Sequence, residues 1–261
     1  MTRFLYAIAM AATLVSVGCD GGGFNAKYTQ DSQKQLGMVY ILPGIQGVDS
    51  HYFNIRRGLA KSGVNCGMMI HPWGCQIPGL NLLLNQTDSV DDRTWGQRIA
   101  ADIVAYQKAY PGKPVHIIGQ SGGAGVAVFT AEALADIPDA KPITGLVLLD
   151  GSLSADYDLT KALSMCSSGI INFYNLRDVA LLQVGTAMFG NVDGGHGDSA
   201  GRTGFEEEYP TLYQVRVTDD MVNGLDDPHF ADCSSAFAGK YLAGWILQSS
   251  WPPAPTQLAR R

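Results

Sequence analysis

The feature that most constrains this chain is a serine framed by glycines between two apolar segments. Residues 115–118 are a short, continuous apolar run, as in a strand buried on both faces. The run leads into Gly119-Gln120-Ser121-Gly122-Gly123, and residues 122–135 are rich in alanine, valine and phenylalanine. A strand that turns abruptly into a helix holds the intervening serine in a strained conformation. Glycines two positions before and after it remove β-carbons that would collide across the turn. The sequence therefore predicts a serine hydroxyl raised above the end of a strand.

Apolar runs and helical patterns alternate along the rest of the chain. Further strands are expected at residues 37–42, 64–70, 145–149, 170–174 and, with alternating character, 213–217. Helices are expected at residues 53–62, 94–110 and 237–248. This alternation predicts an α/β fold with a mostly parallel central sheet and helices on both faces. The segment between residues 149 and 170 is too short for a large cap domain.

The Gly-x-Ser-x-Gly motif in this strand–turn–helix setting resembles the nucleophile elbow of the α/β-hydrolase family. The resemblance extends over roughly residues 37–248. It implies that Ser121 is the nucleophile and that Gly119 and Gly123 shape the elbow. It also implies that the backbone amides of Ile45 and Gly122 form the oxyanion hole. Members of the family often have a histidine where this chain has Pro43, a departure that leaves a backbone donor intact.

The family's chain order places an acid and then a histidine after the serine. Asp178 directly follows the predicted strand 170–174 and is the expected acid, with Asp150, at the end of an earlier strand, as the alternative. Two histidines follow Ser121 in the chain. His229 precedes the closing helix and is the expected base, while His196 lies in a glycine-rich loop and remains the alternative.

These residues imply a serine hydrolase that cleaves carboxylic esters through an acyl-enzyme intermediate, without metal or organic cofactor. The expected substrate is a small-molecule or lipid ester. The same triad also supports lipase, thioesterase and peptidase chemistry, among which the fold does not choose. Trp73 is one of several apolar residues expected to line an acyl pocket, although core packing explains it equally well. The alternative of a different class is a non-catalytic, hydrolase-like binding protein at a membrane surface.

The N-terminus predicts export. A basic start, an apolar run at residues 4–17 and Gly18-Cys19 describe a signal peptide of residues 1–18 that resembles a bacterial lipoprotein signal. The resemblance implies lipid attachment at Cys19 and a membrane anchor, or secretion if lipid is absent. Residues 19–36 are expected to be a tether, residues 37–250 the domain and residues 251–261 a tail. The net charge of −6 without a basic cluster argues against a nucleic-acid partner.

Four cysteines remain after Cys19. An exported chain permits disulfides. On the predicted topology, we expect Cys66 to pair with Cys75 and Cys166 to pair with Cys233.

Overall fold

The computed structural model describes residues 22–75, 89–178, 190–222, 227–248 and 250–253. The expected signal peptide and Cys19 lie outside these residues, as does the end of the expected tail. No helix among the described residues is both long enough and apolar enough to cross a bilayer.

Six parallel strands form one open sheet in the order β2-β1-β3-β4-β5-β6. The strands are β1 (Met38–Leu42), β2 (Gly67–Ile70), β3 (Val115–Gln120), β4 (Ile143–Leu149), β5 (Cys166–Tyr174) and β6 (Leu212–Arg216). The strands of the sheet's interior are almost wholly buried, whereas β6, at the edge, has exposed Gln214 and Arg216 alternating with half-buried residues. The predicted parallel sheet is confirmed, including the alternating edge strand.

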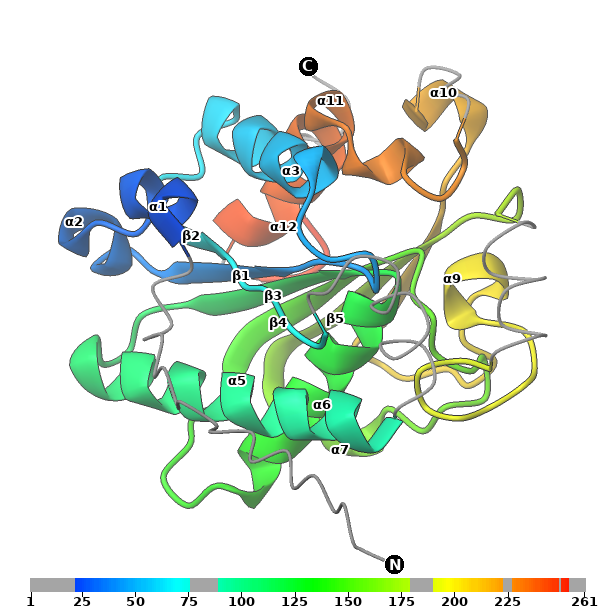
Figure 1. The fold of residues 1–261 in the computed structure, drawn as a ribbon, viewed down its shortest axis with the longest axis horizontal. Coiled ribbons are helices and arrows are strands. Elements are labelled where there is room, and N and C mark those ends of the chain that lie inside the picture. The colour runs from blue at the N-terminus through cyan, green and yellow to red at the C-terminus, as the bar shows by residue number, and fades with distance from the viewer. Residues whose placement is uncertain (1–21, 76–88, 179–189, 223–226, 249, 254–261) are drawn as a thin grey trace, which may run out of the picture.

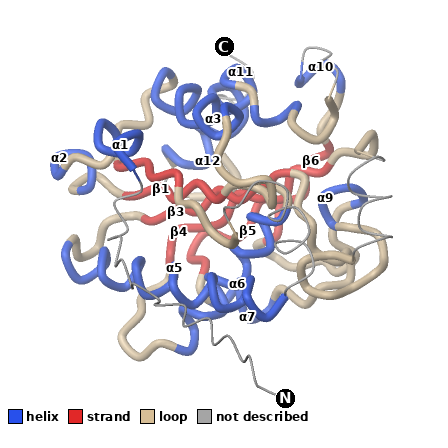
Figure 2. Tube along the Cα trace, viewed as in Figure 1, coloured by secondary structure: helices blue, strands red, loops and turns tan. Residues whose placement is uncertain are grey.

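Helices cover both faces of the sheet (Figures 1 and 2). On one face lie α5 (Ser89–Ala109), α6 (Gly122–Asp136) and α7 (Thr160–Ser164). On the other lie α3 (Ser50–Lys61), α11 (Ser235–Phe237), the π-helix η4 (Ala238–Leu242) and α12 (Ala243–Leu247). The expected closing helix thus contains a π-helical turn. The remaining short elements are α1 (Gly22–Asn25), η1 (Ala26–Tyr28), α2 (Asp31–Lys34), α9 (Ala200–Thr203), α10 (Asp219–Val222) and η3 (Ala231–Cys233).

Two apolar clusters form the core, one on each face of the sheet. Phe129 and Ile103 belong to the cluster beneath α5 and α6, whereas Ile55 and Phe237 belong to the cluster beneath α3 and α11. Between β4 and β5 the chain carries only the short helix α7. This connection therefore holds no cap domain.

Residues outside the expected domain boundaries pack against the domain at both ends. Within the expected tether, Asn25 is buried and its side chain bonds to both the N–H and the carbonyl of Ile70. Arg56 donates to the same side chain at 2.8 Å. At the other end, Trp251 is buried and its indole N–H donates to the carbonyl of Trp245 at 2.7 Å. The packed unit therefore begins before residue 37 and continues past residue 250, because polar side chains satisfy buried backbone groups there.

Neither expected disulfide forms, since Cys66, Cys166 and Cys233 carry free thiols. Cys166 begins β5 whereas Cys233 lies in η3, beyond the opposite end of the sheet. Cys66 comes directly before β2 and Cys75 comes after it. The strand between them is roughly 13 Å long. A disulfide needs Cα atoms within about 7 Å.

Candidate active site

Ser121 occupies a strained turn between β3 and α6. Its backbone has φ 54° and ψ −125°, a conformation that is costly for any residue with a side chain. The Ser121 N–H donates to the Leu149 carbonyl at 2.9 Å, and the Ser121 carbonyl accepts from the Ser152 N–H at 3.1 Å. These two bonds to the end of β4 and the segment after it hold the turn. The hydroxyl makes no capping hydrogen bond to α6, so it does not serve that helix as an N-cap.

Gly119 and Gly123 of the elbow must both lack a side chain, but for different steric reasons. A β-carbon on Gly119 would lie 2.4 Å from the carbonyl oxygen of Gly123, which is a collision across the turn. A β-carbon on Gly123 would lie 2.2 Å from the carbonyl oxygen of Pro43. The nearest atoms to this β-carbon belong to the end of β1 and the segment that follows it, whereas the sequence predicted a collision across the turn. Gly123 lets α6 approach that segment closely.

The segment after β1 also lies against the first residue of α6. A β-carbon on Gly122 would lie 2.6 Å from Cγ2 of Ile45 and 3.3 Å from Cη2 of Trp73. The Trp73 indole N–H donates to the Pro43 carbonyl at 2.6 Å, which fixes the ring in this position. The first N–H groups of a helix have no acceptor within the helix itself. The residues whose amides were expected to form an oxyanion hole are therefore neighbours, beside the elbow.

Asp178 and His229 meet in a buried hydrogen bond. Nδ1 of His229 bonds to Oδ2 of Asp178, and the two residues are 3% and 2% exposed. A carboxylate accepts, so Nδ1 carries the proton and Nε2 is left as the acceptor. The loop that carries Asp178 follows β5, and the loop that carries His229 precedes η3.

Side-chain amides tie the two loops to each other and to the elbow. The Gln120 amide donates to the carbonyl of His229 at 3.2 Å. The Asn175 amide donates to the carbonyl of Pro228 at 2.9 Å, and the carbonyl of Asn175 accepts from the N–H of Asp178 at 3.0 Å. Because Gln120 is the residue before Ser121, these bonds hold the imidazole loop beside the serine's own strand.

Tyr52, fully buried on α3, connects the segment after β1 to the elbow. Its hydroxyl accepts from the N–H of Gly44 at 2.7 Å and donates to Oε1 of Gln120 at 2.9 Å. It also accepts from the side-chain amide of Gln46. Burial raises the pKa of the phenol well above its usual value, which keeps the donating proton in place. One hydroxyl thus links the segment that contains Ile45 to the strand that presents Ser121.

Two further carboxyl groups are buried close to the imidazole. Asp150, which follows β4 with φ 43°, has one oxygen that lies within 4.8 Å of both Asp178 and His229. Burial, followed by the charges of Asp232 and Asp178, raises the pKa of Asp150 well above its usual range. Burial likewise raises the pKa of Asp232 to about 7, opposed by the charge of His229. The carboxyl groups of a buried cluster of this kind cannot all ionise.

Asp150, Asp178 and His229 also have the spacing of a possible metal site. The hydrogen bond between Asp178 and His229 already engages one carboxylate oxygen and Nδ1. His196, the alternative base, is exposed on its loop, next to Gly190. The structure thus brings the expected acid and base together at the elbow, with Asp150 beside them.

No protein-family model matches the sequence, and no curated protein matches it either. Solved structures do resemble the fold. Lipase B of Aspergillus fumigatus superposes with a TM-score of 0.51 at 8% identity, over 92% of this chain and 57% of that one. The chain therefore spans little more than half the length of that lipase.

This protein has the α/β-hydrolase fold. Two other structures align with lower scores. A lipase-esterase related protein of Clostridium acetobutylicum has a TM-score of 0.45 at 10% identity, over 84% of this chain and 95% of that one. A cutinase-like protein from Cryptococcus sp. has a TM-score of 0.42 at 14% identity, over 82% and 94%.

Tyr52, Gln120 and Asp232 belong to this candidate site but were not predicted from the sequence. Gln120 was visible only as the variable position of the elbow motif, and Tyr52 lies one residue before the expected helix 53–62. A buried polar side chain needs a partner, but the partners of Tyr52 and Gln120 lie up to 109 positions away in the chain. No local pattern could have indicated them.

Proposed function

We propose that this protein is a serine hydrolase that cleaves carboxylic esters, with Ser121 as nucleophile, His229 as base and Asp178 as acid. The proposal rests on one observation. Ser121 has a strained backbone (φ 54°) and a hydroxyl that does not cap α6, and it lies beside the buried Asp178–His229 pair. Strained backbone conformations cluster at active sites, and here the strained residue has a hydroxyl that does not cap the helix. The general likeness to a lipase supports only the fold.

The proposed reaction follows from the protonation of the pair. Nδ1–H of His229 is held by Asp178, so Nε2 takes the proton from the Ser121 hydroxyl as its oxygen attacks the ester carbonyl. The amides of Ile45 and Gly122 receive the oxyanion, a contribution of about 3 kcal/mol per donor in comparable enzymes. The imidazolium then protonates the leaving alcohol. Water, activated by the same imidazole, releases the acid and restores the serine.

A fluorophosphonate probe tests this proposal. The full-length protein should be labelled at one serine, and Ser121→Ala should abolish both labelling and hydrolysis of p-nitrophenyl esters without loss of fold by circular dichroism. His229→Ala should lower the rate by several orders of magnitude, whereas His196→Ala, on an exposed loop, should leave it within a few-fold. A correctly folded wild-type protein that reacts with neither probe nor ester would favour the non-catalytic, binding alternative.

The substrate belongs to the same proposal. Trp73 lies beside Gly122 and is 2% exposed, so we propose that it walls the side of the site next to the oxyanion hole. A chain-length series of p-nitrophenyl esters measures the acyl preference. If Trp73 bounds the acyl group, Trp73→Ala should shift the optimum toward longer chains, whereas an unchanged optimum would remove it from the acyl pocket.

We also propose that the protein is exported and lipid-anchored at Cys19. The support is the sequence of residues 1–19 alone. Incorporation of radiolabelled palmitate should be lost in Cys19→Ala, and incorporation that survives this change would refute attachment at Cys19.

A further inference from the structure

The most exposed large apolar side chains among the described residues gather at one end of the molecule. Leu36 is 57% exposed and Leu247 is 52% exposed. They come from opposite ends of the chain but line the same surface hollow, together with Pro114. Pro114 lies directly before β3, so this is the end at which the strands begin. Two prominent leucines at one place on a surface indicate a contact with something apolar.

Three exposed lysines adjoin these leucines. Lys108, Lys113 and Lys141 line a neighbouring hollow of about 710 Å³ that Leu247 also borders. Leu36 and Lys113 share a third hollow. Because the three hollows share residues, the two leucines and three lysines belong to one continuous surface, which we call the basal surface.

The lysines of the basal surface are not neutralised by ion pairs within the described residues. Gln107 exchanges two hydrogen bonds with the backbone of Lys141, at 2.7 and 3.1 Å, and so pins that loop to α5. Within the described part of the chain, none of the three lysines forms a salt bridge. Two carboxylates share the surface. Asp31 accepts from the hydroxyl of Tyr110 at 2.7 Å, and Asp139 borders the larger hollow.

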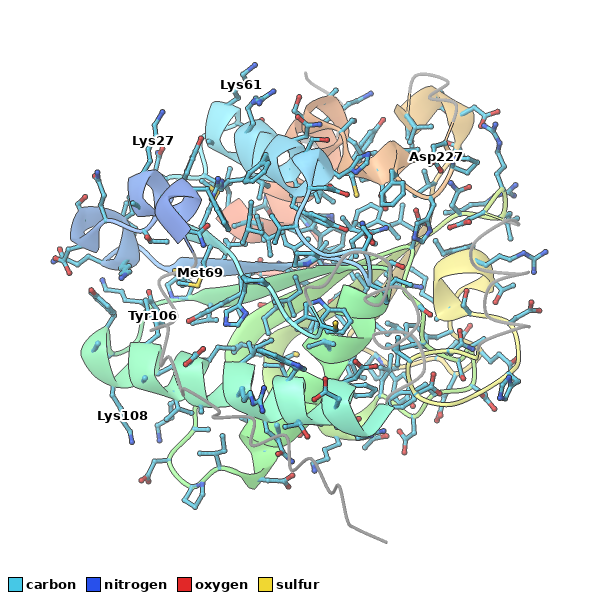
Figure 3. All side chains as sticks on the ribbon, in the orientation of Figure 1. Lys27, Lys61, Met69, Tyr106, Lys108 and Asp227 are labelled. Carbon is cyan, nitrogen blue, oxygen red and sulfur yellow. The ribbon has the colours of Figure 1, made fainter. Side chains whose placement is uncertain are left out.

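This pattern contrasts with the charge of the whole chain and with the proposed active site. The chain carries a net charge of −6. In Figure 3, Lys27 and Lys108 lie toward one end of the molecule and Asp227 lies toward the other. β3 runs from the basal surface to Ser121, and its six residues span roughly 20 Å. Unpaired lysines around exposed leucines therefore lie at the end of the sheet opposite the serine.

We propose that the basal surface rests on an anionic phospholipid bilayer, with the Ser121 site turned away from it. Lysine ammonium groups are attracted to lipid phosphates, and leucine side chains gain free energy by entering the boundary of the acyl chains. The described fold begins at Gly22, three residues after Cys19, the proposed site of lipid attachment. Three lysines and two leucines give a weak, salt-sensitive contact, which orients the protein rather than anchoring it.

Vesicle co-sedimentation of the full-length protein tests this surface. One variant carries Lys108→Gln, Lys113→Gln and Lys141→Gln. Its control carries Arg57→Gln, Arg216→Gln and Lys240→Gln, which remove the same charge from exposed residues elsewhere. On vesicles of equimolar phosphatidylcholine and phosphatidylglycerol, partitioning of the first variant should fall roughly fivefold for each lysine removed. The control should bind as the wild type does, and high salt should remove the difference.

Several results would overturn the proposal. If both triple variants lost vesicle binding equally, the net charge of the protein and not the basal surface would explain the binding. An equal difference on vesicles of phosphatidylcholine alone would exclude recognition of anionic lipid. A dimer in sedimentation velocity that dissociates on Leu36→Asn and Leu247→Asn would show that a second copy covers the surface. Ester hydrolysis in solution should be the same in all variants, so this test does not depend on the proposed catalytic residues.

Discussion

At the scale of single residues, the candidate site contains more buried carboxyl groups than the proposed triad uses. Asp150, Asp178 and Asp232 are at most 2% exposed and surround one imidazole. Asp178 holds Nδ1 of His229, whereas both carboxyl oxygens of Asp150 are buried without a hydrogen-bond partner in the described structure. A charged carboxylate would be very costly in that position. The raised pKa of Asp150 therefore favours its neutral form beside the Asp178–His229 hydrogen bond.

The two candidate acids can be ranked by neutral isosteres. Asp178→Asn removes the acceptor that holds Nδ1–H and should lower kcat about 10⁴-fold, as the equivalent change does in serine proteases. Asp150→Asn replaces a carboxyl whose raised pKa favours the neutral form, so it should lower kcat less than about tenfold. Steady-state kinetics with one p-nitrophenyl ester measures both. The opposite ranking would make Asp150 the acid.

Asp232 predicts how stability depends on pH. Its pKa rises to about 7 in the fold, so the folded state holds a proton that the unfolded state loses at lower pH. A raised carboxyl pKa contributes stability below the unfolded value and loses it as pH rises through the folded value. Between pH 4 and 7 the wild type should therefore lose on the order of a few kcal/mol relative to Asp232→Asn. Urea unfolding across this range tests it, with the exposed Asp156→Asn as control. Parallel curves for wild type and Asp232→Asn would contradict the assignment.

At the scale of elements, the proposed catalytic geometry depends on bonds between segments that the chain places far apart. The segment after β1, the end of β3 and the loop before η3 each contribute one part of the site. Tyr52 on α3 binds the first two, and Gln120 binds the last two. Because these partners are buried, removing one leaves a polar group unsatisfied at a cost of about 1–3 kcal/mol.

Tyr52→Phe isolates this connection. It leaves the Gly44 N–H without its acceptor and Gln120 without a donor, so kcat/KM should fall roughly tenfold to a hundredfold. KM should change little, because the ground state does not use the oxyanion hole. Tyr106→Phe is the matched control, since that buried hydroxyl bonds to the Lys34 carbonyl at 2.7 Å, away from the site. Equal kinetics in the two variants would leave Tyr52 a purely structural role.

At the scale of the whole molecule, apolar packing on both faces of the sheet holds the described elements together, without a disulfide at Cys66, Cys166 or Cys233. Two apolar clusters enclose the sheet, and the thiols of Cys166 and Cys233 are part of that packing. Burial raises the pKa of Cys166 to about 12 and that of Cys66 to about 11. A buried thiol with a raised pKa is a poor nucleophile.

The native protein should therefore keep Cys66, Cys166 and Cys233 unmodified by iodoacetamide at pH 8, and all three should react in urea. A reducing agent should not change the midpoint of thermal unfolding. Peptide mass spectrometry after alkylation reads out each residue. A midpoint that falls on reduction, or a cross-linked peptide pair, would show a disulfide in the native protein.

The sequence by itself determined the strand–turn–helix around Ser121, the parallel sheet and the order of its candidate acid and base. These features depend on local periodicity and on glycines at a tight turn, which are visible within a few residues. The sequence does not show that Asn25 and Trp251 belong to the packed unit, because their burial depends on partners elsewhere in the chain.

Only the tertiary structure decided which side chains meet. It joined Asp178 to His229, surrounded them with Asp150 and Asp232, and put Tyr52 between the segment after β1 and the end of β3. It also placed Cys66, Cys166 and Cys233 where no pair of them forms a bridge. Contacts of this kind depend on the register of neighbouring strands and on the paths of loops between them. A short-range pattern predicts where a strand ends, but the packing of the sheet determines what lies opposite that end.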